Sequence, residues 1–205
     1  MTVAGIVLAG GMSRRFQSDK ACEPYKHGTF LSHAYTELKA VSDIAAVSGR
    51  NLKDPEITSF EDCPPFKGLG PLAGIYSAMK IVKSEWYLVL ACDMPLIERQ
   101  TLSVFTGLKT AGHSAVVPVI YGKVHPLCAM YHCSLLPVLQ KQLEDRELKM
   151  MSLLHAAEPL MLDQSHFDRP DRFANINKKE DLALLIEPKS QLGKKTLKNS
   201  VFIVK

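Results

Sequence analysis

Hydrophobic residues follow two alternating patterns along the chain: short continuous runs, and longer segments in which they recur every three or four residues. A continuous run predicts a strand that is covered on both faces of a sheet. The clearest runs are Val3–Leu8, Ile44–Ser48, Trp86–Ala91 and Ala115–Ile120, and weaker ones lie near 127–131 and 159–162. A last run at 201–204 could form an edge strand, pairing either within the domain or with another subunit.

The segments with helical spacing lie between these runs. They predict helices over 29–41, 71–82, 98–110, 134–143, 149–156 and 178–186. Strands that alternate with helices are typical of α/β proteins. We therefore expect a mostly parallel central sheet flanked by helices on both faces.

Length and composition fit one domain with a short tail. The chain has 205 residues, of which 46% are hydrophobic, enough for a sizeable core. Its net charge is +4, but residues 189–205 contain five lysines and no acid, so residues 1–188 carry −1. We expect a folded domain over 1–188 and a basic, solvated tail over 189–205. A nearly neutral body without a basic stripe argues against nucleic acid as a partner.

The sequence also predicts a cytoplasmic location without membrane association. No apolar run approaches the ~18 residues that a membrane span needs. The first residues, Met1 to Ala4, lack the basic start and apolar core of a signal peptide.

Polar and glycine-rich segments follow three of the predicted strands. The loop after Val3–Leu8 contains Gly10 and Gly11, followed by Arg14, Arg15 and Lys20. Glycines let backbone N–H groups approach an anion closely, and the three cations add positive charge, so this loop is a candidate phosphate cradle.

The other two segments are Ser48-Gly49-Arg50 and Asp93. Ligands bind beyond the carboxyl ends of strands in open parallel sheets, so we expect all three segments to meet in one site. Asp93 has two possible roles at this stage: an oxygen ligand for Mg²⁺ shared with substrate phosphates, or a cap of the following turn.

Two common nucleotide motifs are excluded. The first glycine loop lacks the G-x4-G-K-[ST] pattern, and Gly68-Leu69-Gly70-Pro71-Leu72-Ala73 fits G-x-G-x-x-A but follows no apolar strand. We interpret the second loop as the start of the helix at 71–82.

Four segments together resemble the nucleotidyltransferases that include the molybdenum cofactor guanylyltransferases. The stretch from Leu8-Ala9-Gly10-Gly11 to Asp19-Lys20 resembles their signature loop. Further matches, in the same order, are Gly70-Pro71-Leu72-Ala73-Gly74, Cys92-Asp93-Met94-Pro95 and Asn175-Ile176-Asn177-x2-Glu180-Asp181-Leu182. The likeness covers roughly residues 3–186 and implies a Rossmann-like nucleotidyltransferase fold.

The resemblance also implies a reaction. GMP would pass from GTP to the molybdopterin cofactor, giving the guanine dinucleotide form and pyrophosphate. Lys20, with Arg15 as a weaker candidate, would neutralise the triphosphate, and Asp93 would bind Mg²⁺. Residues implied to contact the nucleotide or the acceptor are Leu8, Ala9, Gly10, Gly11, Lys20, Ser48, Asp62, Asp93, His125, Asn175 and Asn177. Other cofactor-biosynthesis proteins and apo-molybdoenzymes are candidate protein partners.

Some positions depart from the family pattern. Phe16-Gln17-Ser18 lacks the usual glycine, and Ser48 stands where asparagine is common. Two alternatives therefore remain open: a cytidylyl- or sugar-phosphate nucleotidyltransferase, and a nucleotide-binding cofactor carrier without catalysis.

Overall fold

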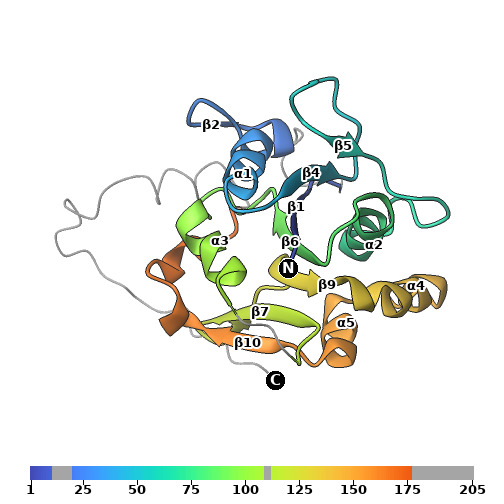
Figure 1. Ribbon diagram of the computed structural model, residues 1–205. Helices are drawn as coiled ribbons and strands as arrows, with labels where there is room; N and C mark the ends of the chain where they lie inside the picture. Colours follow the sequence, from blue (N-terminus) through green and yellow to red (C-terminus); the bar gives the residue numbers. More distant parts are fainter. Residues whose placement is uncertain (11–19, 109–111, 177–205) are drawn as a thin grey trace, which may run out of the picture.

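A computed structural model describes residues 1–10, 20–108 and 112–176 (Figure 1). Its main feature is an eight-stranded mixed sheet in the order β10-β7-β9-β6-β1-β4-β5, with β8 paired to β7. The strands are β1 (Val3–Leu8), β4 (Ile44–Ser48), β5 (Ser59–Phe60), β6 (Trp86–Ala91), β7 (Ala115–Ile120), β8 (Lys123–Val124), β9 (Cys128–His132) and β10 (Leu160–Asp163). A separate hairpin consists of β2 (Pro24–Tyr25) and β3 (Gly28–Thr29).

The parallel half of the sheet holds β1 at its centre. β1 pairs in parallel with β4 on one side and with β6 on the other, and β5 adds to β4 in the same direction. β9 runs antiparallel to both β6 and β7, so the sheet is mixed but mostly parallel, as expected. All residues of β1 and β6 are buried, which explains their uninterrupted apolar sequence.

Helices cover both faces. The α-helices are α1 (Phe30–Lys39), α2 (Pro71–Ile81), α3 (Arg99–Thr106), α4 (Leu136–Glu144) and α5 (Met150–Ala157). The 3-10 turns are η1 (Lys20–Cys22), η2 (Cys133–Leu135), η3 (Gln164–His166) and η4 (Pro170–Phe173). Two cores result, because successive strand side chains point to opposite faces: α2, α4 and α5 cover one, and α1, α3 and η4 cover the other (Figure 1).

Local chemistry explains where the helices begin. Thr29 caps α1, accepting the Ser32 N–H at 3.2 Å, while the Ser32 hydroxyl accepts the Thr29 N–H at 2.8 Å. Gly70 caps α2 with a φ of 82°, and Pro71 follows at the first helical position, as the glycine loop predicted.

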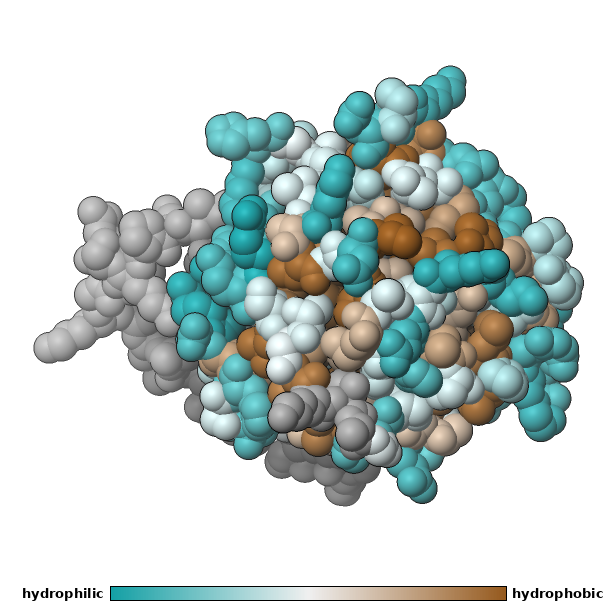
Figure 2. All heavy atoms as spheres, viewed as in Figure 1, coloured by the Kyte–Doolittle hydropathy of each residue, from teal (hydrophilic) through white to brown (hydrophobic). Residues whose placement is uncertain are grey.

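The predicted helix ends were less accurate. The helix expected over 29–41 ends at Lys39, and the one expected over 98–110 ends at Thr106 before the C-cap Gly107. The expected helix 178–186 and strand 201–204 lie outside the described residues. In the described part of the chain, no helix has the length and apolarity to cross a membrane. On the face drawn in Figure 2, hydrophobic residues lie among hydrophilic ones.

Candidate active site

The loops after β1, β4 and β6 meet at the carboxyl edge of the parallel strands. The Ala9 N–H donates to the Ser48 carbonyl at 3.0 Å, and the Cys92 N–H donates to the Leu8 carbonyl at 3.3 Å. Hydrogen bonds therefore join the start of the β1 loop to the ends of β4 and β6. This confirms the expectation that Gly10, Ser48-Gly49-Arg50 and Asp93 lie along one edge.

The start of the β1 loop is fixed by the segment that follows β4. The Arg50 guanidinium donates to the Ala9 carbonyl from Nε at 3.1 Å and from Nη2 at 2.8 Å. Gly49 has a φ of +99°, and a Cβ there would lie 2.6 Å from the Gly10 nitrogen. Gly49 and Arg50 thus shape the loop, and their only sequence signal was their place at a strand end.

A second group of side chains joins β1, β4 and α2. The Ser48 hydroxyl is buried and donates to the Gly74 carbonyl at 3.0 Å. A Cβ on Gly74 would lie 2.9 Å from Leu8 Cδ2, 3.4 Å from Ser48 Oγ and 3.9 Å from Asp62 Oδ1. The structure therefore brings Leu8, Ser48 and Asp62 together, although the Ser48 hydroxyl is turned toward the protein backbone.

The Asp62 carboxylate is only partly satisfied. Its Oδ2 accepts the Gly68 N–H at 3.2 Å, whereas its buried Oδ1 accepts no hydrogen bond within the described residues. Burial raises the pKa of Asp62, an effect that the Gly68 N–H and the nearby Ser48 hydroxyl partly offset. An unpaired buried carboxylate oxygen is costly in a folded protein, so a ligand N–H or O–H that reached it would be stabilised.

Asp93 and Asn175 are brought together although they are 82 positions apart in the sequence. Asn175 Nδ2 donates to Asp93 Oδ1 at 3.3 Å, and the Ile176 N–H donates to the Asp93 carbonyl at 3.0 Å. The segment after η4 therefore lies across the end of β6. The Asp93 carboxylate and the Asn175 amide carbonyl are oxygen donors of the kind that Mg²⁺ prefers.

These two residues fit a metal that phosphates help to hold. Among the described residues, no group of three or more His, Cys, Asp or Glu side chains could hold a metal ion. Mg²⁺ in nucleotide enzymes is typically bound by one or two carboxylates together with substrate phosphates and water. The donor set present here matches that pattern.

His125 lies on the same side of the sheet as η4. Its ring packs edge-on against Phe173, with centroids 5.2 Å apart. Burial, with a smaller effect from Lys123, lowers the pKa of His125 to about 4, so the imidazole is neutral at pH 7. His125 can accept or donate a neutral hydrogen bond, but its contact with an acceptor substrate stays a prediction.

The remaining candidates are described in part or not at all. Gly11, Arg15 and Asn177 lie outside the described residues. Lys20 begins η1, and the structure describes only its backbone. Gly10 is exposed and is the last described residue of the β1 loop before Lys20.

Comparison with known proteins gives consistent matches. The MobA-like NTP transferase domain matches residues 5–160. A Bacillus subtilis protein named probable molybdenum cofactor guanylyltransferase is 36% identical over 197 residues, covering 94% of this chain and 98% of that protein. A Bacillus cereus protein of the same name is 32% identical over 185 residues, covering 87% of this chain and 92% of that protein.

Solved structures confirm the fold. Molybdopterin-guanine dinucleotide biosynthesis protein A from Archaeoglobus fulgidus superposes with a TM-score of 0.74 at 21% identity, over 88% of this chain and 95% of that one. The 2-C-methyl-D-erythritol 4-phosphate cytidylyltransferase from Thermus thermophilus superposes with a TM-score of 0.65 at 16% identity, over 90% of this chain and 97% of that one. The expected Rossmann-like nucleotidyltransferase fold is confirmed.

Proposed function

This chain belongs to the MobA-like NTP transferase family, and we propose that it transfers GMP from GTP to the molybdopterin cofactor with release of pyrophosphate. The observation that carries the proposal is the meeting of the Gly10 loop with the Asp93–Asn175 pair at one sheet edge. That edge is where α/β proteins bind nucleotides.

In the proposed reaction, an oxygen of the acceptor's terminal phosphate attacks the α-phosphorus of GTP. The new P–O bond joins GMP to the acceptor, and the bond to the β-phosphate breaks, so pyrophosphate leaves with its electron pair. Catalysis of this kind depends on positioning and on neutralising charge.

The chain's own residues divide these tasks. The backbone of the Leu8-Ala9-Gly10-Gly11 loop holds the nucleotide, with the Gly10 and Gly11 N–H groups as donors because the Ala9 N–H is already bound to the Ser48 carbonyl. Lys20, assisted by Arg15, offsets the charge of the triphosphate. Asp93 and Asn175 would hold Mg²⁺, which would neutralise phosphate charge. Asn177 is proposed to lie with them.

Recognition of the nucleoside falls mainly on Asp62. Its buried Oδ1 accepts no hydrogen bond from the part of the chain that the structure describes, whereas the Ser48 hydroxyl donates to Gly74. Ser48 therefore contributes by fixing the β4–α2 packing under the nucleoside. His125 is proposed to contact the molybdopterin acceptor. A cytoplasmic location, the domain at 1–188, the tail at 189–205 and delivery to apo-molybdoenzymes stay predictions.

The test is pyrophosphate release by the full chain with GTP, Mg²⁺ and molybdopterin. Lys20→Ala and Asp93→Ala should each lower turnover ~100-fold, because one charge-stabilising group contributes ~3 kcal/mol to the transition state. The exposed pair of Lys141 on α4 and Asp145, its C-cap residue, supplies matched controls, and their alanine variants should keep wild-type turnover.

Three results would contradict parts of the proposal. Faster turnover with CTP than with GTP would remove the guanine specificity. Near-normal turnover of Asp93→Ala would remove the metal assignment. GTP binding without pyrophosphate release from molybdopterin or a sugar phosphate would leave a nucleotide-binding carrier instead of an enzyme.

A further inference from the structure

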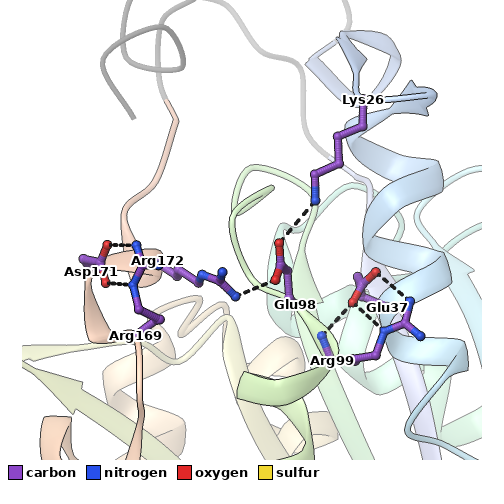
Figure 3. A network of polar contacts seen from close by, with 7 residues as sticks. All are labelled: Lys26, Glu37, Glu98, Arg99, Arg169, Asp171 and Arg172. Atoms are coloured by element: carbon purple, nitrogen blue, oxygen red, sulfur yellow. Dashed lines mark hydrogen bonds and ion pairs between the residues drawn. The ribbon is translucent and has the colours of Figure 1, made fainter. Parts of the chain in front are cut away.

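Glu98 is bound by two cations that come from distant parts of the chain (Figure 3). Lys26 Nζ lies 3.2 Å from its Oε1, across 72 positions of sequence. Arg172 Nη1 lies 2.6 Å from its Oε2, across 74 positions. Each carboxylate oxygen thus holds a different segment.

Each of the three residues lies close in the sequence to a candidate site residue. Glu98 is the N-cap residue of α3 and follows the Asp93 turn, whereas Lys26 lies in the β2–β3 turn, shortly after η1 and Lys20. Arg172 lies in η4, shortly before Asn175. From the start of α3, just after Asp93, Glu98 therefore links the β2–β3 hairpin, which follows Lys20, to the segment that carries Asn175.

Contacts beyond Arg172 show what this link holds in place. Ile176 is buried in a small cluster with Tyr25 and Phe30, from the hairpin and α1. Its N–H donates to the Asp93 carbonyl at 3.0 Å, and the preceding Asn175 side chain donates to the Asp93 carboxylate. The short segment from Arg172 to Ile176 is thus attached to Glu98 at one end and to Asp93 and the hairpin at the other.

We propose that Glu98 is a positioning residue of the nucleotidyl-transfer site, which holds Asn175 against Asp93 by binding Arg172 and Lys26 together. The expected effect of Glu98 on turnover rests on the proposed function. Its expected effect on the order of the segment from Arg172 to Ile176 is independent of that function.

The charges around Glu98 support this role. Arg172 is a half-buried cation and Lys26 an exposed one, and the two would repel each other without the Glu98 carboxylate between them. The neighbouring Arg169 is bound by Asp171 through two hydrogen bonds of 2.9 and 2.7 Å, so it is already paired. Burial alone would raise the pKa of Glu98, but Lys26 and Arg172 hold it below its usual value, and the side chain is charged at pH 7.

Helix α3 has a separate attachment. The Glu37 carboxylate of α1 accepts the Arg99 N–H at 2.6 Å and also pairs with the Arg99 guanidinium (Figure 3). Removing the charge of Glu98 therefore leaves the start of α3 anchored. Glu98→Gln should fold, which allows positioning to be measured apart from folding.

The first measurement is amide hydrogen exchange of the full chain without substrates. Glu98→Gln should speed exchange of the Ile176 N–H about fivefold or more, because two ion pairs that order this segment are lost. Arg169→Gln is the matched control, since it removes the ion pair between Asp171 and Arg169, the N-cap residue of η4, without removing a hydrogen bond to Glu98, and its exchange should match the wild type.

The second measurement is turnover against Mg²⁺ concentration. Glu98→Gln should raise the Mg²⁺ concentration for half-maximal rate about threefold or more and lower kcat, while Tm stays near the wild-type value. A merely structural role would lower Tm and leave the Mg²⁺ requirement unchanged. The double variant Lys26→Gln/Glu98→Gln should differ little from Glu98→Gln in kcat and in Mg²⁺ requirement, because both substitutions remove the same link.

Each result decides one question. Unchanged exchange at Ile176 in Glu98→Gln, or an equal increase in Arg169→Gln, overturns the link. Faster exchange with an unchanged kcat and Mg²⁺ requirement overturns the positioning role. A wild-type chain that releases no pyrophosphate contradicts the proposed function, whereas the exchange experiment still tests the link.

Discussion

Substitution of Gly49 by alanine should damage both stability and GTP binding, because it forces the β1 loop to move. Gly49 has a φ of +99°, and an added Cβ would lie 2.6 Å from the Gly10 nitrogen and 2.7 Å from the Gly10 Cα. Both contacts are with backbone atoms, which cannot rotate away as a flexible side chain can. The positive φ costs about 1 kcal/mol for a residue with a Cβ, and displacing packed backbone costs about 2 more.

The expected loss in the free energy of unfolding is thus about 3 kcal/mol, measured by urea unfolding. The shift of Gly10 should also raise the KM for GTP about tenfold, since small displacements in a positioned site cost this much or more. The matched control is Gly112→Ala. Gly112 has a similar φ of +89°, but no described atom lies within 4 Å of an added Cβ.

Gly112→Ala should therefore lose only the conformational part, about 1 kcal/mol, and keep the wild-type KM. If Gly49→Ala and Gly112→Ala lose equal stability and share the same KM, the close approach of Gly49 to Gly10 has no role in the site.

Two further predictions concern stability alone. The pKa of His125 is about 4 in the folded protein and near 6.5 when unfolded, so stability is full above pH 6.5 and falls as protons bind the unfolded chain below it. Near pH 5, His125 should reduce the free energy of unfolding by about 2 kcal/mol. This loss should be absent in His125→Phe and retained in the exposed control His155→Gln. The prediction is refuted if the wild type and both variants show the same dependence of urea unfolding on pH. Glu37→Ala should lower the free energy of unfolding by about 2 kcal/mol, because the buried carboxylate accepts hydrogen bonds from the Arg99 N–H and guanidinium. Lys141→Ala, in an exposed pair, should leave it near the wild-type value. Equal urea midpoints for these two variants would contradict the importance of the Glu37 contact.

The sequence alone determined the elements whose cause is local. β1, β4 and β6 have the bounds that their hydrophobic runs predicted. For β1 and β6 the reason is that a strand buried on both faces needs apolar residues throughout. The glycine before Pro71 predicted the start of α2 because backbone conformation at a helix start depends on neighbouring residues. Parallel strands also place their carboxyl ends together, which predicted the edge where Asp93 lies.

Only the tertiary structure decided which distant groups meet at that edge. The Asn175–Asp93 contact, the turn of the Ser48 hydroxyl toward Gly74 and the binding of Glu98 by Arg172 each depend on how separate segments pack. Spacing rules act over a few residues of a helix or strand, whereas these contacts span tens of positions and form only once the sheet order is fixed. Nothing near Glu98 in the sequence indicated its partners, because a charged residue at a helix start is common and its partners lie on two other segments.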